Sequence, residues 1–193
     1  MDFETDKELE EEMTNVMENM IMPMLEGTGE VPMTGLMFPD SEHLPEEIKE
    51  DMKDNPDAKA MFVVPAMGAP DKEAFYQILS GLARDNKIRN TMFFSDTWIS
   101  KKPMEDIEKG EFVMPSEDPD RADALLLHYV NTDVNGMLLK TAMLCQEYEN
   151  VDGKIVYGER NLMITDNTDP SPPSDGNVIG SRVADAVSSN DWA

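Results

Sequence analysis

The sequence predicts an α+β fold, with an antiparallel sheet of about five strands and helices packed on one face of it. Two amphipathic helical patterns predict the helices, and three apolar segments joined by short turns predict most of the sheet. Since 193 residues suffice for one domain with tails, we expect a core domain at residues 45–165. An acidic, Met-rich helix and an irregular connection precede it at residues 1–44, and a flexible acidic tail follows at residues 166–193.

The N-terminal segment has a strong helical pattern. Thr5 and Glu8 have the spacing of a capping box, in which each side chain accepts a hydrogen bond from the other residue's backbone N–H. Pro23 is expected to stop or kink the helix. Residues 26–44 are rich in Gly and Pro and are expected to form an irregular connection. The apolar stripe of the helix consists of Leu9, Met13, Val16, Met17, Met20, Ile21 and Met24.

The middle of the chain predicts two helices and two strands. A short helix is expected from Pro45 to about Asn55, and a compact apolar strand at residues 61–64. An aromatic strand is expected from Thr91 to Ser100, and a polar excursion follows from Lys101 to Arg121. Between the two strands, a second amphipathic helix is predicted from Pro70 to Asn86, with a buried stripe of Ala74, Phe75, Ile78, Leu79, Leu82 and Ala83.

Three apolar segments close the core domain, at residues 122–131, 137–149 and 154–165. The turn between the first two contains Asn-Gly, and the turn between the last two contains Asp-Gly. Both dipeptides favour the positive φ angles of tight hairpins, so the segments predict a three-stranded antiparallel meander.

The chain is strongly acidic, with a formal net charge of −24, and 18 of its 40 acidic residues lie in residues 1–60. Non-specific binding to nucleic acids and anionic membranes depends on Lys and Arg, so we expect direct binding to neither. The acid serves either solubility or mimicry of DNA phosphates, which would inhibit a nucleic-acid-binding protein. No apolar run is long enough to span a bilayer, and the acidic N-terminus lacks the positive charge of a signal peptide. We therefore expect a cytoplasmic protein.

The sequence contains no recognisable motif for catalysis, phosphate binding or metal binding. His43 and His128 have no partner at metal-ligand spacing. Cys145, the only cysteine, lies in an apolar segment and is expected to be a buried, inert thiol. We therefore expect a non-enzymatic protein without a cofactor or a metal.

One polar cluster is a candidate site. Asp96 and Trp98 belong to the aromatic strand, and Arg121 ends the polar excursion. If Arg121 folds back toward Asp96, the pair frames a polar pocket lined by Trp98, which would suit a small enzyme or a ligand-binding domain. The alternative is a structural ion pair that holds the excursion against the sheet.

The same stretch resembles a family of uncharacterised phage and bacterial proteins, which has no established activity. In that family a strand ends in Ser-Glu-x-Trp, and Pro-Ser-x-x-Pro-x-Arg then leads into a hydrophobic strand. Here the motifs are Phe94-Ser95-Asp96-Thr97-Trp98 and the run from Pro115 to Leu126, with Asp96 in place of the usual glutamate. The resemblance implies a phage or prophage origin.

Two segments are candidates for contact with a protein partner. Methionine side chains form adaptable apolar surfaces, and a tryptophan near a chain end can anchor a docking peptide. The candidate residues are Met13, Met17, Met20, Met24 and Trp192. We expect a small accessory protein that binds another protein. The alternatives are a DNA-mimicking inhibitor and a ligand-binding or enzymatic domain centred on Asp96, Trp98 and Arg121.

Overall fold

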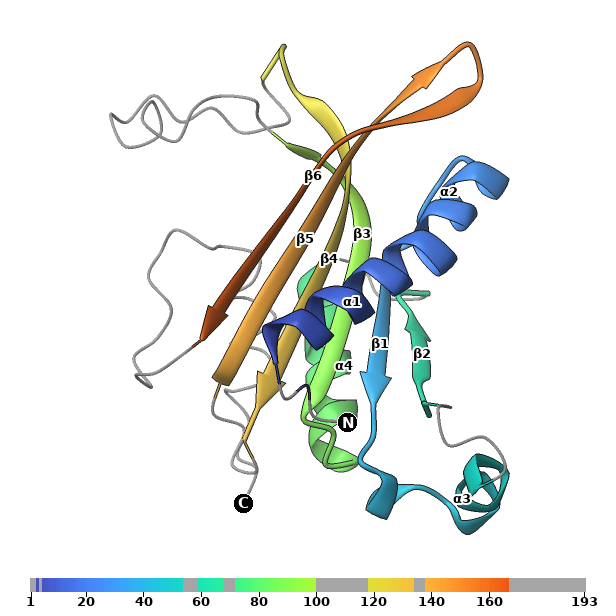
Figure 1. Ribbon diagram of the computed structural model, residues 1–193, viewed down its shortest axis with the longest axis vertical. Coiled ribbons are helices and arrows are strands. Elements are labelled where there is room, and N and C mark those ends of the chain that lie inside the picture. Colours follow the sequence, from blue (N-terminus) through green and yellow to red (C-terminus); the bar gives the residue numbers. More distant parts are fainter. Residues whose placement is uncertain are drawn as a thin grey trace.

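The computed structural model describes residues 3, 5–53, 59–67, 72–99, 118–133 and 138–166. Within these residues, six strands form one antiparallel sheet in the order β2-β1-β3-β4-β5-β6 (Figure 1). The strands are β1 (Thr34–Phe38), β2 (Phe62–Pro65), β3 (Asn90–Ile99), β4 (Ala122–Thr132), β5 (Leu138–Val151) and β6 (Lys154–Asp166). The α+β class is confirmed, with six strands instead of about five.

The helices cover both faces of the sheet, so the prediction that they pack on one face is wrong. A continuous N-terminal helix, made of α1 (Asp6–Val16), η1 (Met17–Ile21) and α2 (Met22–Thr28), crosses one face, which we call the front face (Figure 1). Helix α4 (Lys72–Asp85) packs on the opposite, back face. Alternate residues of a strand point to opposite faces. Accordingly, Phe94 contacts the N-terminal helix cluster and its neighbour Phe93 contacts the α4 cluster.

The N-terminal helix begins as its sequence predicts and ends later than predicted. The Thr5 hydroxyl accepts from Glu8 N at 3.2 Å, and a Glu8 carboxylate oxygen accepts from Thr5 N at 3.0 Å. Pro23 does not stop the helix. The wider π turn η1 ends directly before α2, where Met22 N donates to Met17 O, five residues back. Because this turn changes the hydrogen-bond register just before the residue that lacks a donor, the helix continues to Thr28.

Strand β1 lies inside the segment predicted to be irregular. All five of its residues are buried, and it pairs with β2 on one side and β3 on the other. Gly35 makes room for α4, because a Cβ at this position would lie only 2.4 Å from Leu79 Cδ2 and would force that side chain to shift. The Gly and Pro residues that predict a loop therefore flank or occupy a central strand, which receives its stability from neighbours distant in sequence.

Helix α4 packs on the back face through a stripe that differs from the predicted one. Phe75, Leu79 and Ala83 are buried as predicted, but Tyr76 is also buried and Ile78 is 46% exposed. Leu82, also predicted to be buried, is exposed. The helix is turned toward Tyr76 because that ring makes an edge-to-face contact with Phe93, at a centroid distance of 5.2 Å.

The other predicted helices and strands are present. The short helix is α3 (Glu46–Lys53), and the strand predicted at residues 61–64 is β2, at the edge of the sheet. The predicted meander is β4-β5-β6. Its last turn has positive φ at Asp152 and Gly153, as the Asp-Gly dipeptide predicts. Most of the polar excursion, part of the turn after β4 and the predicted tail lie outside the described residues.

The N-terminal helix is tied to the far strands by charge pairs. Lys140 Nζ donates to an Asp6 carboxylate oxygen at 2.6 Å, and Arg160 Nη1 donates to a Glu18 carboxylate oxygen at 2.7 Å. These pairs join residues 134 and 142 positions apart in the chain. The helix is therefore part of the same packed unit as the meander.

Candidate functional site

The predicted cluster lies at one end of the front face. Trp98 of β3 pairs with Asp123 of β4, and Asp123 pairs with Tyr148 of β5, so the three side chains form a row across the sheet. Asp96 lies two residues before Trp98 on the same face. Together with Thr97, these residues line a depression of about 270 Å³.

Arg121 joins this row by stacking on Trp98. Its Cζ atom lies 4.2 Å from the centroid of the Trp98 ring, which is a cation–π distance. The structure therefore brings all three predicted residues together. This contact places the Arg121 guanidinium beside the depression, and the pairing of Arg121 with Asp96 stays a prediction.

The pKa of the Tyr148 phenol is shifted by its surroundings in the depression. Burial raises the pKa of its phenol, and the negative charges of Asp123 and Asp96 raise it further. The phenol is therefore a neutral hydrogen-bonding group at neutral pH, and both carboxylates are close enough to influence it. Two aromatic rings and two carboxylates are suited to holding an organic cation.

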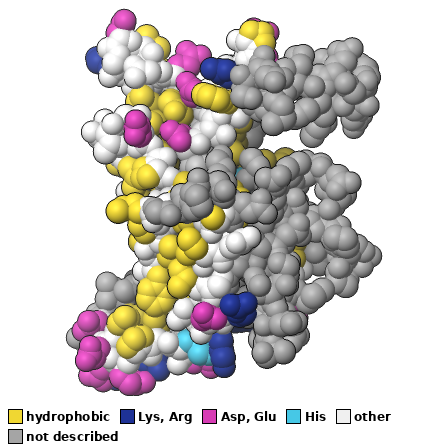
Figure 2. Space-filling view, turned by 180° about the vertical axis from the view of Figure 1, so that it is seen from behind, with side chains coloured by type: hydrophobic (Ala, Val, Ile, Leu, Met, Phe, Trp, Pro, Cys, Tyr) yellow, Lys and Arg dark blue, Asp and Glu magenta, His cyan; other side chains and the backbone are white. Residues whose placement is uncertain are grey.

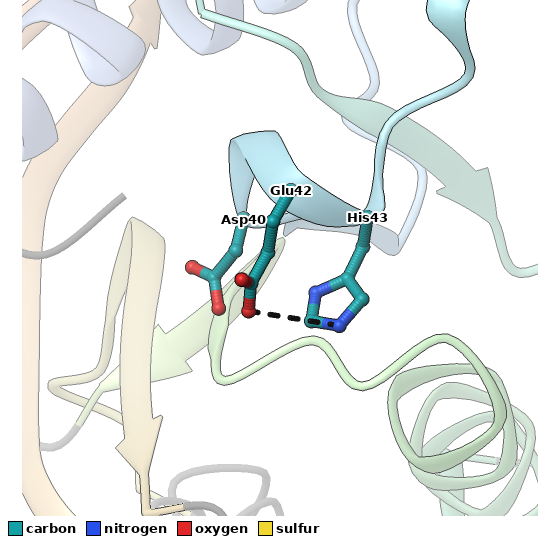
Figure 3. Close-up of side chains that lie close together, drawn as sticks. All are labelled: Asp40, Glu42 and His43. Atoms are coloured by element: carbon teal, nitrogen blue, oxygen red, sulfur yellow. Dashed lines mark ion pairs between the residues drawn. The ribbon is translucent and has the colours of Figure 1, made fainter.

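A second cluster, which the sequence analysis missed, lies in the turn after β1. One ligand atom from each of Asp40, Glu42 and His43 lies within 4.8 Å of the others (Figure 3). The turn is fixed between Pro39 and Leu44, both buried. Carboxylate and imidazole groups are suitable ligands for a divalent transition metal. In the sequence, the only signal of this cluster is that its three residues lie within four positions of one another.

Asp40 already has a cationic partner. Arg89 Nη2 lies 3.2 Å from Asp40 Oδ2, and Arg89 Nε donates to the same oxygen. Burial by itself raises the pKa of Asp40, but nearby positive charge, including Arg89, outweighs it and lowers the pKa below its ordinary value. A metal ion would have to compete with this guanidinium for the Asp40 carboxylate.

The methionine stripe is mostly part of the core. Met13 and Met17 are fully buried against the sheet, which removes them from the predicted partner surface. Met20 and Met24 are partly exposed and remain candidates. Helical periodicity identifies an apolar face, but it does not show whether that face packs on the same chain or on a partner. Trp192 lies outside the described residues.

Met20 lines a groove between the N-terminal helix and the β2 edge. The groove has a volume of about 570 Å³. Its apolar walls come from Val16, Met20, Phe38 and Met61, and its polar walls from Glu12, Asn15, Asn19 and Lys59. Beside it, Phe62, Val63 and Met67 are exposed. Seen from behind, hydrophobic side chains form a band on the half of the molecule that carries α4 and β2 (Figure 2).

The remaining reactive side chains lie within the sheet. His128 is buried on the back face, with its ring 6.1 Å from that of Phe93. Burial raises the pKa of the Cys145 thiol to about 11, and the charge of Glu147 adds to the shift. Cys145 is therefore protonated at neutral pH, which makes it a poor nucleophile.

Comparisons with protein-family models, curated proteins and solved structures found no match to this chain. The resemblance to phage and bacterial proteins stays a prediction. None of the helices in the described part of the chain has the length and apolar character needed to cross a membrane.

Proposed function

We propose that this chain is a small, non-enzymatic accessory protein, of phage origin and acting in the cytoplasm, that binds an extended segment of another protein along the β2 edge. One observation carries the proposal: an exposed apolar strand edge continues into an apolar groove. A partner segment with alternating apolar side chains and some basic ones would fit this surface.

The β2 edge supports strand addition. In the described sheet, β2 pairs with β1 alone, so its outer side presents backbone N–H and C=O groups to a partner strand. Natural sheet edges are protected by charged residues, by Pro and by short strand length. The four-residue β2 ends in Pro65 but contains no charged residue, and Val63 is 50% exposed. Met67, two residues beyond the strand, is 88% exposed.

The adjoining groove supports the choice of an apolar and basic segment. Met20 and Met61 line it with flexible side chains that can adapt to different apolar groups. The exposed side of α1 is acidic and favours a basic partner, while Glu8 caps the helix and Glu11 pairs with Lys7. An acidic segment would be repelled by a chain with a net charge of −24.

The test compares two exposed valines on opposite edges of the sheet. Val63→Lys places a charge on β2, and Val156→Lys places the same charge on β6, where Val156 is 52% exposed. Each variant and the wild type are used in quantitative pull-downs at low and moderate salt concentration. The proposal expects a protein retained by the wild type and by Val156→Lys, but lost with Val63→Lys.

Two results would contradict the proposal. Equal retention by both variants would show that the β2 edge is not the contact surface. Retention that falls steeply with salt and is insensitive to both substitutions would favour the DNA-mimic alternative, because binding through mimicked phosphates is dominated by charge.

A further inference from the structure

The depression at Trp98 has the composition of a site for an organic cation. Its walls are two aromatic side chains, Trp98 and Tyr148, and its polar groups include the carboxylates of Asp96 and Asp123. Aromatic faces attract cations through the ring quadrupole, and carboxylates pair with them by charge-assisted hydrogen bonds. Among the described residues, no lysine lines the depression.

The sheet holds these groups in fixed positions. Trp98, Asp123 and Tyr148 are paired across three hydrogen-bonded strands, so their spacing is set by the strand register and not by a loop. Tyr148 also packs against the core under the N-terminal helix, which anchors one wall. Trp98, in contrast, is 46% exposed at the open side of the row.

Arg121 shows which cation the site accepts. Its guanidinium lies over the Trp98 ring at 4.2 Å, although its backbone precedes β4 and its side chain is exposed. The guanidinium is planar and weakly hydrated, so it stacks on an aromatic face while its N–H groups remain able to reach carboxylates. Arg121 therefore occupies the ring face as a ligand from the same chain would.

From these contacts we propose that the depression binds the guanidinium group of a second molecule, which takes the place of Arg121 on Trp98 and pairs with Asp123 and Asp96. The group can come from a free small molecule or from an arginine side chain of a protein. This site is separate from the β2 edge and does not depend on the function proposed for that edge.

The experiment measures Trp98 fluorescence in a Trp192→Phe background. The titrants are agmatine, a free guanidinium compound, and the peptide acetyl-Gly-Arg-Gly-amide. Butylamine serves as an ammonium comparison. Saturable quenching by either guanidinium titrant is expected, with weaker binding of butylamine. Tighter binding of the peptide identifies a protein source, and tighter binding of agmatine identifies a small molecule.

Two substitutions should change the affinity in opposite directions. Arg121→Gln removes the internal competitor and should tighten binding about threefold or more. Asp123→Asn removes a charge-assisted hydrogen bond and should weaken it about tenfold. Glu149→Gln is the matched control, because it removes one charge from a neighbouring, exposed position of β5 that does not line the depression. Asp96→Asn repeats the test if Asp123→Asn does not fold.

Two results would overturn the proposal. One is the absence of saturable binding of either guanidinium titrant to both the wild type and Arg121→Gln. The other is equal weakening by Asp123→Asn and Glu149→Gln, which would show attraction to the net charge of the protein instead of a site.

Discussion

The contact between Gly35 of β1 and Leu79 of α4 gives a quantitative test of how the back face is packed. A methyl group added by Gly35→Ala would lie 2.4 Å from Leu79 Cδ2 and 3.0 Å from Cδ1. Overpacking of this kind costs about 1–3 kcal/mol. Reduced entropy of the unfolded chain returns about 0.4–1 kcal/mol. The expected net loss in the free energy of unfolding is about 1–2 kcal/mol.

The same substitution should have the opposite sign once the Leu79 side chain is truncated. Leu79 is buried, so Leu79→Ala should cost about 2–5 kcal/mol. Without its terminal carbons the clash is absent, and the Gly35→Ala methyl fills part of the cavity. In this background Gly35→Ala should stabilise by about 0.5 kcal/mol, which makes the coupling energy of the pair about 2 kcal/mol.

Urea unfolding followed by circular dichroism measures all four free energies of the cycle. Gly27→Ala is the control, because a Cβ at Gly27 meets nothing within 4 Å. It should stabilise α2 by about 0.5–1 kcal/mol. An equal effect of Gly35→Ala in both backgrounds would refute the reasoning, because it would mean that α4 does not rest on Gly35.

Three further results are expected. At pH 8, Cys145 should react with iodoacetamide about 100-fold more slowly in the folded protein than in the unfolded chain, because its pKa is raised from 9.0 to about 11; similar rates, measured by mass spectrometry, would contradict this. Thr5→Ala should lower the free energy of unfolding by about 1 kcal/mol through loss of the cap; a loss below about 0.3 kcal/mol would show that the helix start contributes little. Asp40→Asn should cost about 1 kcal/mol near neutral pH by removing the pair with Arg89. The pKa of Asp40 is lowered in the folded state, so its stabilisation is present above the ordinary value of 3.8 and is lost as the pH falls through the folded pKa. Urea titrations should therefore show the difference between Asp40→Asn and wild type shrinking in acid, and a constant difference would contradict the assignment.

Local chemistry made part of the fold predictable from sequence. The capping pair Thr5 and Glu8 and the Asp-Gly dipeptide at Asp152 each act within four residues, so the sequence contains the whole interaction. The meander follows because its turns are short and its strands adjacent. These elements needed no knowledge of distant parts of the chain.

The features of the fold that the sequence did not predict depend on interactions between segments that lie far apart in the chain. Strand β1 depends on pairing with β3, which lies more than 50 residues later in the chain. The local sequence around its Gly35 instead favours a loop. In α4, stripes that include Tyr76 or Ile78 are both compatible with helical periodicity, and contact with Phe93 selects Tyr76.

The sequence predicted three residues of the candidate site, but it did not predict which side chains contact one another. Asp96, Trp98 and Arg121 were grouped because a polar excursion starts and ends beside them. The register of β3 and β4 then pairs Ile99 with Ala122, which brings Arg121 to Trp98. Asp123 and Tyr148 could be added only when the pairing of three strands was known.

The chain order of the N-terminal helix has a consequence during synthesis on the ribosome. Asp6 and Glu18 are made 134 and 142 residues before the partners that hold them, Lys140 and Arg160. At about 5–20 residues per second, the nascent helix waits about 7–28 s for these strands. Throughout that time its methionine face has no complete sheet to cover it.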